Sequence, residues 1–167
     1  SSAASDVYKR QKVNSTFFSE IFLIELKPSY SAINSFNFFL PFLLIFFPGA
    51  FTPTCSEKHL PGYIKHHEKF LSAGIHAIAC LAVNDAHVMF AWAEQNAADG
   101  LIDLFADSRA IFTELLGLKT DMGAVLGIRA SRSAFVVDYG LITHFFKEEP
   151  KAYEVSDAES LLSAVSG

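Results

Sequence analysis

The chain has 167 residues, of which 51% are hydrophobic and 19% are charged, and its formal net charge is -5. This length suits one domain of ordinary size, and the hydrophobic content excludes an intrinsically disordered chain. The negative charge disfavours a nucleic-acid-binding protein, and two cysteines are too few for a disulfide-rich secreted scaffold, although they can form a redox pair.

The composition changes abruptly at Pro48. All nine glycines lie at Gly49 or later, whereas nine of the 17 phenylalanines lie before Pro48. Residues 1–47 carry four basic and three acidic side chains, and residues 48–167 carry nine basic and fifteen acidic ones. The contrast predicts an atypical N-terminal segment over 1–47, which we interpret as non-native or partly disordered, and one folded domain over 48–167.

The N-terminal segment contains an apolar run over residues 38–47 that is broken only by Pro41. A run of this length is too short to span a bilayer, which takes about 20 residues. A buried strand over 43–47 is the favoured interpretation. A secretory signal or membrane anchor within 1–47 is one alternative, and a cloning or read-through remnant over 1–11 is another.

After the composition change, short apolar strands alternate with amphipathic helices. Thr52 followed by Pro53 is typical of an N-cap and a first helical position. This helix is expected to run to about residue 72 and to end before Gly74. The Pro61-Gly62 pair is expected to kink or interrupt it.

The middle of the chain continues the alternation of strand and helix. The pattern predicts, in chain order, a buried strand over 75–83, a helix over 86–96 capped by Asp85, a strand over 101–106, and a helix that Asp107 or Ser108 caps and Gly117 ends.

The C-terminal part of the chain predicts a hairpin and a last helix. Residues 133–137 and 141–147 are apolar runs joined by a turn at 138–140. Ser156 and Glu159 have the spacing of a capping box that opens a helix. The complete order of elements predicts an α/β sandwich with a central mixed β-sheet.

The candidate chemistry lies at Cys55, in the first turn of the first predicted helix. Unpaired backbone N–H groups and the helix dipole favour an anion there, and a thiolate is the reactive form of cysteine. Thr52 can place a hydroxyl beside the sulfur, and Pro48 and Pro53 stiffen the loop. A single cysteine near a helix start is more often inert than reactive. These features alone are therefore compatible with either a reactive or an inert Cys55.

The sequence around Cys55 resembles a known motif. Residues 48–56, PGAFTPTCS, resemble the active-site signature of the peroxiredoxins, in which the order is P-x-x-x-T-x-x-C. With KHLPGY at 58–63, the match looks like the type II, or peroxiredoxin-5-like, branch. Three further strings agree in order: CLAVND at 80–85, LFAD at 104–107 and LGIRASR at 126–132.

The resemblance implies a thioredoxin-like three-layer sandwich and a thiol-dependent peroxidase that reduces hydrogen peroxide and alkyl hydroperoxides in cell redox homeostasis. Cys55 matches the peroxidatic cysteine, whose thiolate attacks a peroxide oxygen and becomes a sulfenic acid. Thr52 matches the threonine that contacts the peroxide, and Pro48 matches the proline that shields the sulfenate from over-oxidation. Arg132 matches the arginine that pairs with the thiolate and the peroxide, with Arg129 as the alternative.

Cys80 is either a resolving cysteine or a buried structural one. Plant-type members of the branch resemble this chain in having a cysteine here, which is proposed to form an intramolecular disulfide. Such a bond would require the helix around Cys55 to unwind locally, because the two sulfurs must reach disulfide geometry. Otherwise glutaredoxin, glutathione or thioredoxin would reduce the sulfenic acid directly.

Other polar clusters have simpler interpretations. A metal site at His59, His66 and His67 is conceivable from their helical spacing, but a solvated helix face is favoured. The resemblance implies no metal, haem or flavin cofactor. The acidic side chains near the C-terminus are expected to lie in solvent: Glu148, Glu149 and Glu154.

The resemblance also bears on partners and location. A homodimer is expected, and the group formed by Trp92, Val88 and Met89 is either core or dimer surface. The cytoplasm is the expected compartment, with an organelle as the alternative. The rival function is a catalytically inactive thioredoxin-fold binding module, in which Cys55 would react slowly with peroxide.

Overall fold

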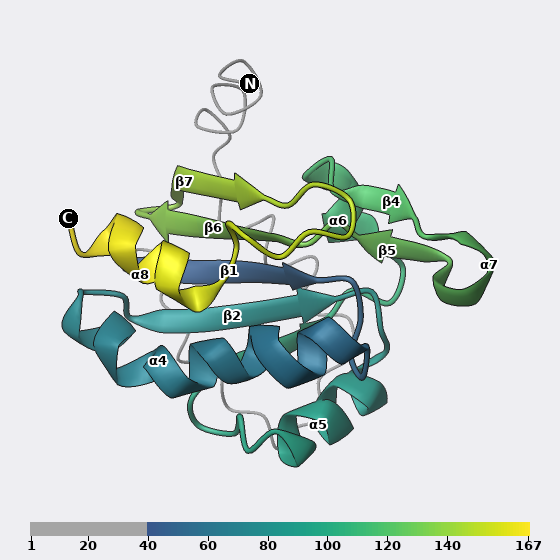
Figure 1. The fold of residues 1–167 in the computed structure, drawn as a ribbon, viewed down its shortest axis with the longest axis horizontal. Coiled ribbons are helices and arrows are strands. Elements are labelled where there is room, and N and C mark those ends of the chain that lie inside the picture. Colours follow the sequence, from purple (N-terminus) through teal and green to yellow (C-terminus); the bar gives the residue numbers. More distant parts are fainter. Residues whose placement is uncertain (1–39) are drawn as a thin grey trace.

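The computed structural model describes residues 40–167, so the interpretations that concern residues 1–39, including a targeting segment, lie outside the described residues. The centre of the molecule is a five-stranded sheet of order β3-β2-β1-β6-β7 (Figure 1). Its strands are β1 (Phe42–Phe47), β2 (Ala77–Ala82), β3 (Asp103–Ala106), β6 (Ser133–Asp138) and β7 (Leu141–Lys147). The pairs β1–β2 and β2–β3 are parallel and the pairs β1–β6 and β6–β7 are antiparallel, which confirms the predicted mixed sheet.

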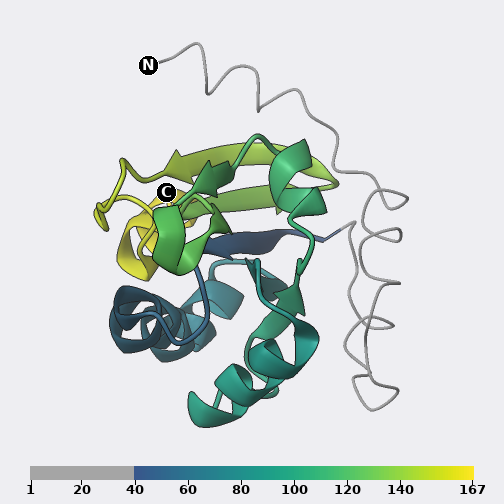
Figure 2. The same ribbon diagram turned by 90° about the vertical axis from the view of Figure 1, so that its right-hand side faces the viewer.

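Helices cover both faces of this sheet (Figures 1 and 2). The remaining elements are a π-helical turn η1 (Cys55–His59), α4 (Leu60–Ser72), α5 (Ala86–Gln95), α6 (Ile111–Leu115), β4 (Lys119–Asp121), α7 (Gly123–Leu126), β5 (Ile128–Ala130) and α8 (Ala158–Val165). Buried side chains of α4, α5 and α8 pack on one face of the sheet, and those of α6 pack on the other. A smaller two-stranded sheet, β4–β5, with the short helix α7 between its strands, was not predicted.

The strand expected over residues 43–47 is present as the middle strand of the sheet. All six residues of β1 are buried, because alternate side chains enter the apolar clusters on the two faces. A strand buried on both faces explains why this segment is continuously apolar. The sheet therefore begins before Pro48, and the composition change falls at the end of its middle strand.

The helix after β1 begins and ends as predicted, but its irregularity lies elsewhere. Helical structure runs without a break from residue 53 to 72, through Pro61 and Gly62. Its second turn is π-helical, with the Leu60 N–H bonded to the Cys55 carbonyl. Pro61 has no N–H to donate, so a widened turn just before it accommodates the proline without an interruption.

Two C-terminal expectations are wrong for a shared reason. Asp157, not Ser156, caps α8, because its carboxylate accepts hydrogen bonds from the N–H groups of Glu159 and Ser160. The Ser156 hydroxyl instead donates a hydrogen bond to Oε1 of Glu148 at 2.8 Å. Glu148 is buried, although it was expected in solvent.

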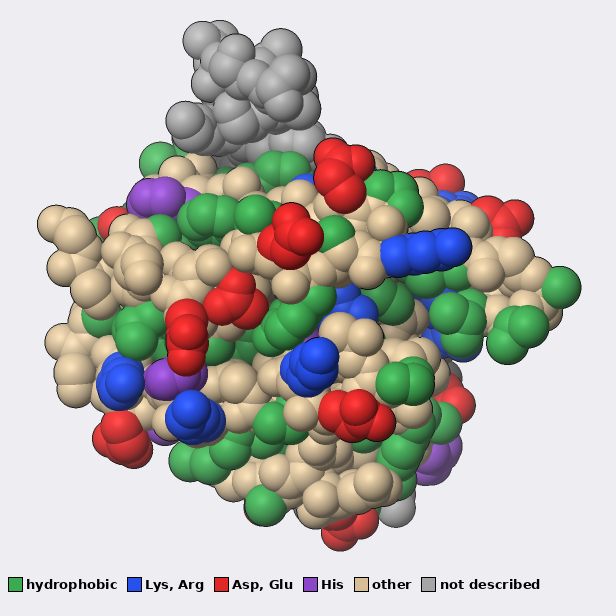
Figure 3. All heavy atoms as spheres, viewed as in Figure 1, with side chains coloured by type: hydrophobic (Ala, Val, Ile, Leu, Met, Phe, Trp, Pro, Cys, Tyr) green, Lys and Arg blue, Asp and Glu red, His purple; other side chains and the backbone are tan. Residues whose placement is uncertain are grey.

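The remaining acidic residues of this region behave as expected. Glu149 and Glu154 are exposed. In the space-filling view, acidic side chains gather over α8 and the loop before it (Figure 3).

Of the other predicted caps, Asp85 is confirmed, whereas the Thr52 hydroxyl donates to the Gly49 carbonyl instead of capping its helix, and the N-cap position of α6 is Ala110 rather than Asp107 or Ser108. Asp85 caps α5, and Asp107 accepts the N–H groups of Ile111 and Thr113 at the start of α6. Trp92 and Met89 are buried in the core. Within residues 40–167, no helix is both long enough and apolar enough to cross a bilayer.

Candidate active site

The candidate nucleophile lies where the middle strand of the sheet passes into a helix. Cys55 is fully buried and carries a free thiol at the start of η1. The N–H of Ser56 donates to the Thr52 carbonyl at 3.0 Å, which places Thr52 in the turn that precedes the cysteine. The Ser56 hydroxyl in turn accepts the indole N–H of Trp92 at 2.9 Å and so ties η1 to α5.

The loop between β1 and η1 is held in a strained conformation. Phe51 has φ of 62°, in the left-handed region that a side chain of this size rarely adopts. The Thr52 hydroxyl donates to the Gly49 carbonyl at 2.8 Å, and the Ala50 N–H donates to the Asn84 side chain at 2.9 Å. Backbone strain of this kind persists only where several contacts determine the conformation, and it clusters at functional sites.

Gly49 is closely packed in this loop. A Cβ at this position would lie 3.3 Å from the Thr52 methyl group and 3.5 Å from Nη1 of Arg129. Both Gly49 and Pro48 are buried. Gly49 thus lies close to the side chains of Thr52 and Arg129.

The two candidate arginines have different surroundings. Nη1 of Arg132 donates to Nδ1 of His59 at 2.9 Å, and His59 lies one helical turn after Cys55. The Arg132 guanidinium also lies over the Tyr153 ring, with Cζ 5.6 Å from the ring centroid. The structure therefore places the Arg132 guanidinium against His59, on the helix that carries Cys55, and its predicted pairing with the thiolate stays a prediction.

Arg129 donates hydrogen bonds to backbone carbonyls. Its Nε donates to the Leu126 carbonyl and its Nη1 donates to the Val83 carbonyl, both at 2.7 Å. This arrangement ties the end of β2 to the segment before β5. Arg129 thus bonds to backbone carbonyls, whereas the Arg132 guanidinium contacts the side chains of His59 and Tyr153.

His59 is not placed as a metal ligand. The described residues contain no group of three His, Cys, Asp or Glu side chains that could hold a metal ion. Nε2 of His59 lies 2.9 Å from the carbonyl oxygen of Ser156, which can only accept a hydrogen bond. Nε2 therefore carries the proton, and Nδ1 is the acceptor for Arg132.

The environment of His59 keeps its ring neutral. Burial and then the positive charge of Arg132 lower the pKa of His59 from 6.5 to about 3. At neutral pH the ring can therefore accept a hydrogen bond from Arg132 without opposing its charge.

The pKa of His59 has a consequence for stability. Between pH 6.5 and about 3 the unfolded chain binds a proton at this residue and the folded chain does not, so the free energy of unfolding should fall as the pH drops through this window. The fall approaches about 1.4 kcal/mol per pH unit. Urea unfolding at several pH values should show a shallower fall for His59→Gln than for the wild-type chain.

The matched control is His67→Gln, on the same helix but only partly buried. This variant should keep the wild-type dependence on pH. Equal slopes for wild type and His59→Gln would contradict the assignment of a buried neutral His59.

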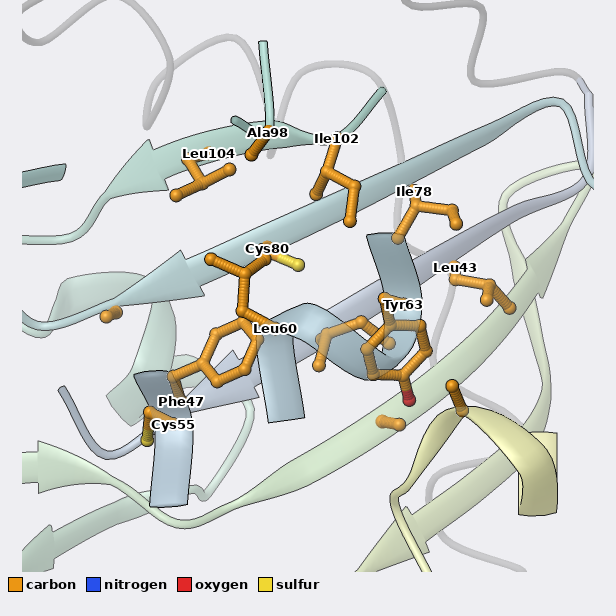
Figure 4. Packing of buried hydrophobic residues seen from close by; sticks show 14 of the residues in the cluster. Leu43, Phe47, Cys55, Leu60, Tyr63, Ile78, Cys80, Ala98, Ile102 and Leu104 are labelled. Carbon is orange, nitrogen blue, oxygen red and sulfur yellow. The ribbon is translucent and has the colours of Figure 1, made fainter. Parts of the chain in front are cut away.

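Cys80 lies in the same buried cluster as Cys55, on one side of the sheet. It is in β2, opposite Ile45 of β1 and Leu104 of β3, and it is fully buried. Burial and then the charge of Asp103 raise the pKa of the Cys80 thiol well above its usual range. Figure 4 shows Phe47 and Leu60 between the two cysteines in that view. Both thiols are free, so a disulfide would require the packing around η1 to open.

Several residues of the site could not be found from the sequence. Tyr153, Ser156 and Asn84 contact the site from distant parts of the chain, and the bond from His59 to Ser156 spans 97 residues. No local spacing marks such contacts. Only the His59 position carried a signal, one turn after the cysteine, and the sequence interpretation assigned it to a solvated face.

Comparison with known proteins identifies related sequences and structures. The redoxin family, described as "Redoxin", matches residues 41–162. The chain is 42% identical over 122 residues to "Peroxiredoxin-2E-2, chloroplastic" of Oryza sativa subsp. japonica, and 40% identical over 126 residues to "Peroxiredoxin-2E, chloroplastic" of Arabidopsis thaliana. These alignments cover 71% and 74% of this chain, but the chain spans only about half the length, 54%, of each of these two relatives.

A solved structure shares the fold as well as the sequence. The crystal structure of reduced Prx3 from Vibrio vulnificus in complex with hydrogen peroxide has a TM-score of 0.74 and 44% sequence identity. The match covers 76% of this chain and 80% of that chain. The similarity therefore extends over the described sheet and its helices.

Proposed function

This chain belongs to the redoxin family and, within it, to the type II peroxiredoxins with their thioredoxin-like fold, and from that premise we propose that it is a thiol-dependent peroxidase. Its substrates are hydrogen peroxide and alkyl hydroperoxides. The observation that carries the proposal is the placement of the Cys55 thiol at a helix start, with Thr52 in the preceding turn and Arg132 bonded to His59 one turn later.

The proposed reaction uses the sulfur as the redox centre. The Cys55 thiolate attacks one peroxide oxygen, so that an S–O bond forms and the O–O bond breaks. Sulfur is oxidised to a sulfenic acid, and the other oxygen leaves as water or an alcohol after it takes up a proton. The reaction needs no metal or organic cofactor.

Each neighbouring residue has a distinct part in this proposal. The hydroxyl proton of Thr52 is donated to Gly49, so the Thr52 oxygen is left to accept a hydrogen bond from the peroxide O–H. Arg132 uses one guanidinium N–H on His59, and its other N–H groups stabilise the thiolate and the departing oxygen. Pro48, which is buried at the start of the loop between β1 and η1, limits access of a second peroxide to the sulfenate.

The surroundings of Cys80 bear on how the sulfenic acid is reduced. The burial of Cys80 and its raised pKa disfavour a rapid attack on the sulfenic acid, because the thiolate is the attacking species. We favour direct reduction by an external thiol, which is glutathione, glutaredoxin or thioredoxin. Disulfide formation with Cys80 is the second route and would require η1 to unwind.

Quaternary structure and compartment are expectations that follow from family membership. We propose a homodimer in solution. We also propose that the protein acts in the cytoplasm or in an organelle, where thiol reductants are available.

A turnover assay tests the function. Purified protein is incubated with each reductant in turn, and consumption of hydrogen peroxide, tert-butyl hydroperoxide and cumene hydroperoxide is followed. We expect sustained turnover with at least one reductant, and retained turnover in Cys80→Ser if the external thiol attacks directly. Loss of turnover in Cys80→Ser would assign resolution to Cys80, and no turnover with any reductant would favour the inactive binding module.

A further inference from the structure

We infer that Glu148 is a positioning residue of this site, whose buried carboxylate shapes the loop over residues 149–157 that holds His59 and Arg132. The inference deepens the proposed function and rests on it, because it concerns the support of the proposed catalytic arginine. Glu148 would act through this loop rather than on the reacting atoms.

The carboxylate of Glu148 accepts hydrogen bonds from several groups of this loop. Its Oε1 accepts hydrogen bonds from the N–H groups of Glu154, Val155 and Ser156, at 2.8, 2.9 and 2.8 Å. The Ser156 hydroxyl adds a fourth bond at 2.8 Å. Bonds to an ionised acceptor are stronger than bonds between neutral groups, so one side chain fixes three successive backbone N–H groups.

The balance of forces keeps Glu148 ionised. Burial alone would raise the pKa of this carboxyl, but the hydrogen bonds from the three N–H groups and from Ser156 outweigh burial and lower it. The anion is therefore the form that shapes the loop at neutral pH.

The loop presents two groups to the active site. The Ser156 carbonyl accepts hydrogen bonds from Nε2 of His59 at 2.9 Å and from the Tyr63 hydroxyl at 2.6 Å. The Tyr153 ring lies under the Arg132 guanidinium and 5.1 Å from the His59 ring, centroid to centroid. Loss of the loop shape would remove the acceptor for His59 and the ring for Arg132 together.

The same residue is joined to Arg132 through the backbone. The N–H of Glu148 donates to the carbonyl of Arg132 at 3.0 Å, one step beyond the last paired residues of β6 and β7. A closed ring results, which runs from the Arg132 backbone through Glu148, Ser156 and His59 to the Arg132 guanidinium. Both ends of the long arginine side chain are thus held by one connected set of hydrogen bonds.

The neighbouring residue supplies a matched control. Glu149 is adjacent in sequence and carries the same charge, but it is exposed. Replacement of Glu149 removes the same charge from the same region without touching the ring. Any effect confined to Glu148 is therefore due to the contacts of its carboxylate rather than to net charge.

A double-mutant cycle tests the inference. The second-order rate constant for oxidation of Cys55 by hydrogen peroxide is measured for wild type, Glu148→Ala, Arg132→Met and the double variant. We expect Glu148→Ala to lower this constant about tenfold or more, because displacement of a catalytic group by about 1 Å has effects of this size. In the Arg132→Met background the same change should alter it less than twofold, and Glu149→Ala should alter it less than twofold in either background.

The possible outcomes distinguish a failure of the positioning role of Glu148 from a failure of the proposed peroxidase function. Equal rates for Glu148→Ala and Glu149→Ala, or an equal loss with and without Arg132, would overturn the positioning role. A wild-type chain that does not react with peroxide would instead overturn the proposed function. If circular dichroism shows that Glu148→Ala is unfolded, Glu148→Gln, which keeps the side-chain shape, replaces it in the same cycle and is judged by the same criteria.

Discussion

Cys55→Ser is expected to abolish the rapid reaction with hydrogen peroxide. The sulfur is the atom that is oxidised in the proposed reaction, and a serine hydroxyl at this position cannot form a sulfenic acid. By analogy with removal of other enzymatic nucleophiles, we expect a loss on the order of 10³-fold or more in the second-order rate constant. Stopped-flow measurement of peroxide consumption under single-turnover conditions gives this constant directly.

Cys80→Ser is the matched control for this change. It alters the only other thiol of the chain, which lies in the same buried cluster as Cys55. The first oxidation step should proceed in Cys80→Ser at nearly the wild-type rate. Rapid peroxide consumption by Cys55→Ser, or its loss in Cys80→Ser, would contradict the assignment of the nucleophile.

Arg132→Met is expected to have the second-largest effect. Methionine has a similar length but offers neither charge nor N–H donors, so the thiolate and the departing oxygen lose their proposed cationic partner. Removal of one donor that acts on the transition state costs about 10²- to 10³-fold in rate. The same stopped-flow experiment measures the effect.

Arg129→Met distinguishes the two arginines. Arg129 donates to two backbone carbonyls, so its loss should reduce the free energy of unfolding by about 1–3 kcal/mol. The rate with peroxide should change far less than in Arg132→Met. A larger loss of rate in Arg129→Met than in Arg132→Met would reverse the assignment.

The strands and the candidate nucleophile could be predicted because their signals are local. β1 and β2 are continuously apolar since both of their faces are buried, and a run of this kind is visible in the sequence. The start of the helix at Pro53 follows from the preference for proline at the first helical position. The spacing of Pro48, Thr52 and Cys55 is likewise a feature of one short segment.

The support of the site could not be predicted because it depends on tertiary contacts. Ser156 and Glu159 have the spacing of a capping box, yet Ser156 bonds to Glu148 and leaves the cap to Asp157. The choice between Ser156 and Asp157 depends on a buried carboxylate eight positions earlier in the chain. His59 is similar, since its partners are Arg132, in the connection between β5 and β6, and Ser156, in the loop before α8.

The central claim is that the Cys55 thiolate attacks the peroxide and takes up one of its oxygen atoms. Measurement of the intact mass of the protein tests this claim most directly. The purified protein is treated with one equivalent of hydrogen peroxide and sampled over seconds, beside Cys55→Ser. We predict a rapid gain of one oxygen atom, or a loss of two hydrogens if Cys80 then forms a disulfide, and neither change in the variant. An unchanged mass after minutes on folded protein, or the same gain in Cys55→Ser, would contradict the account.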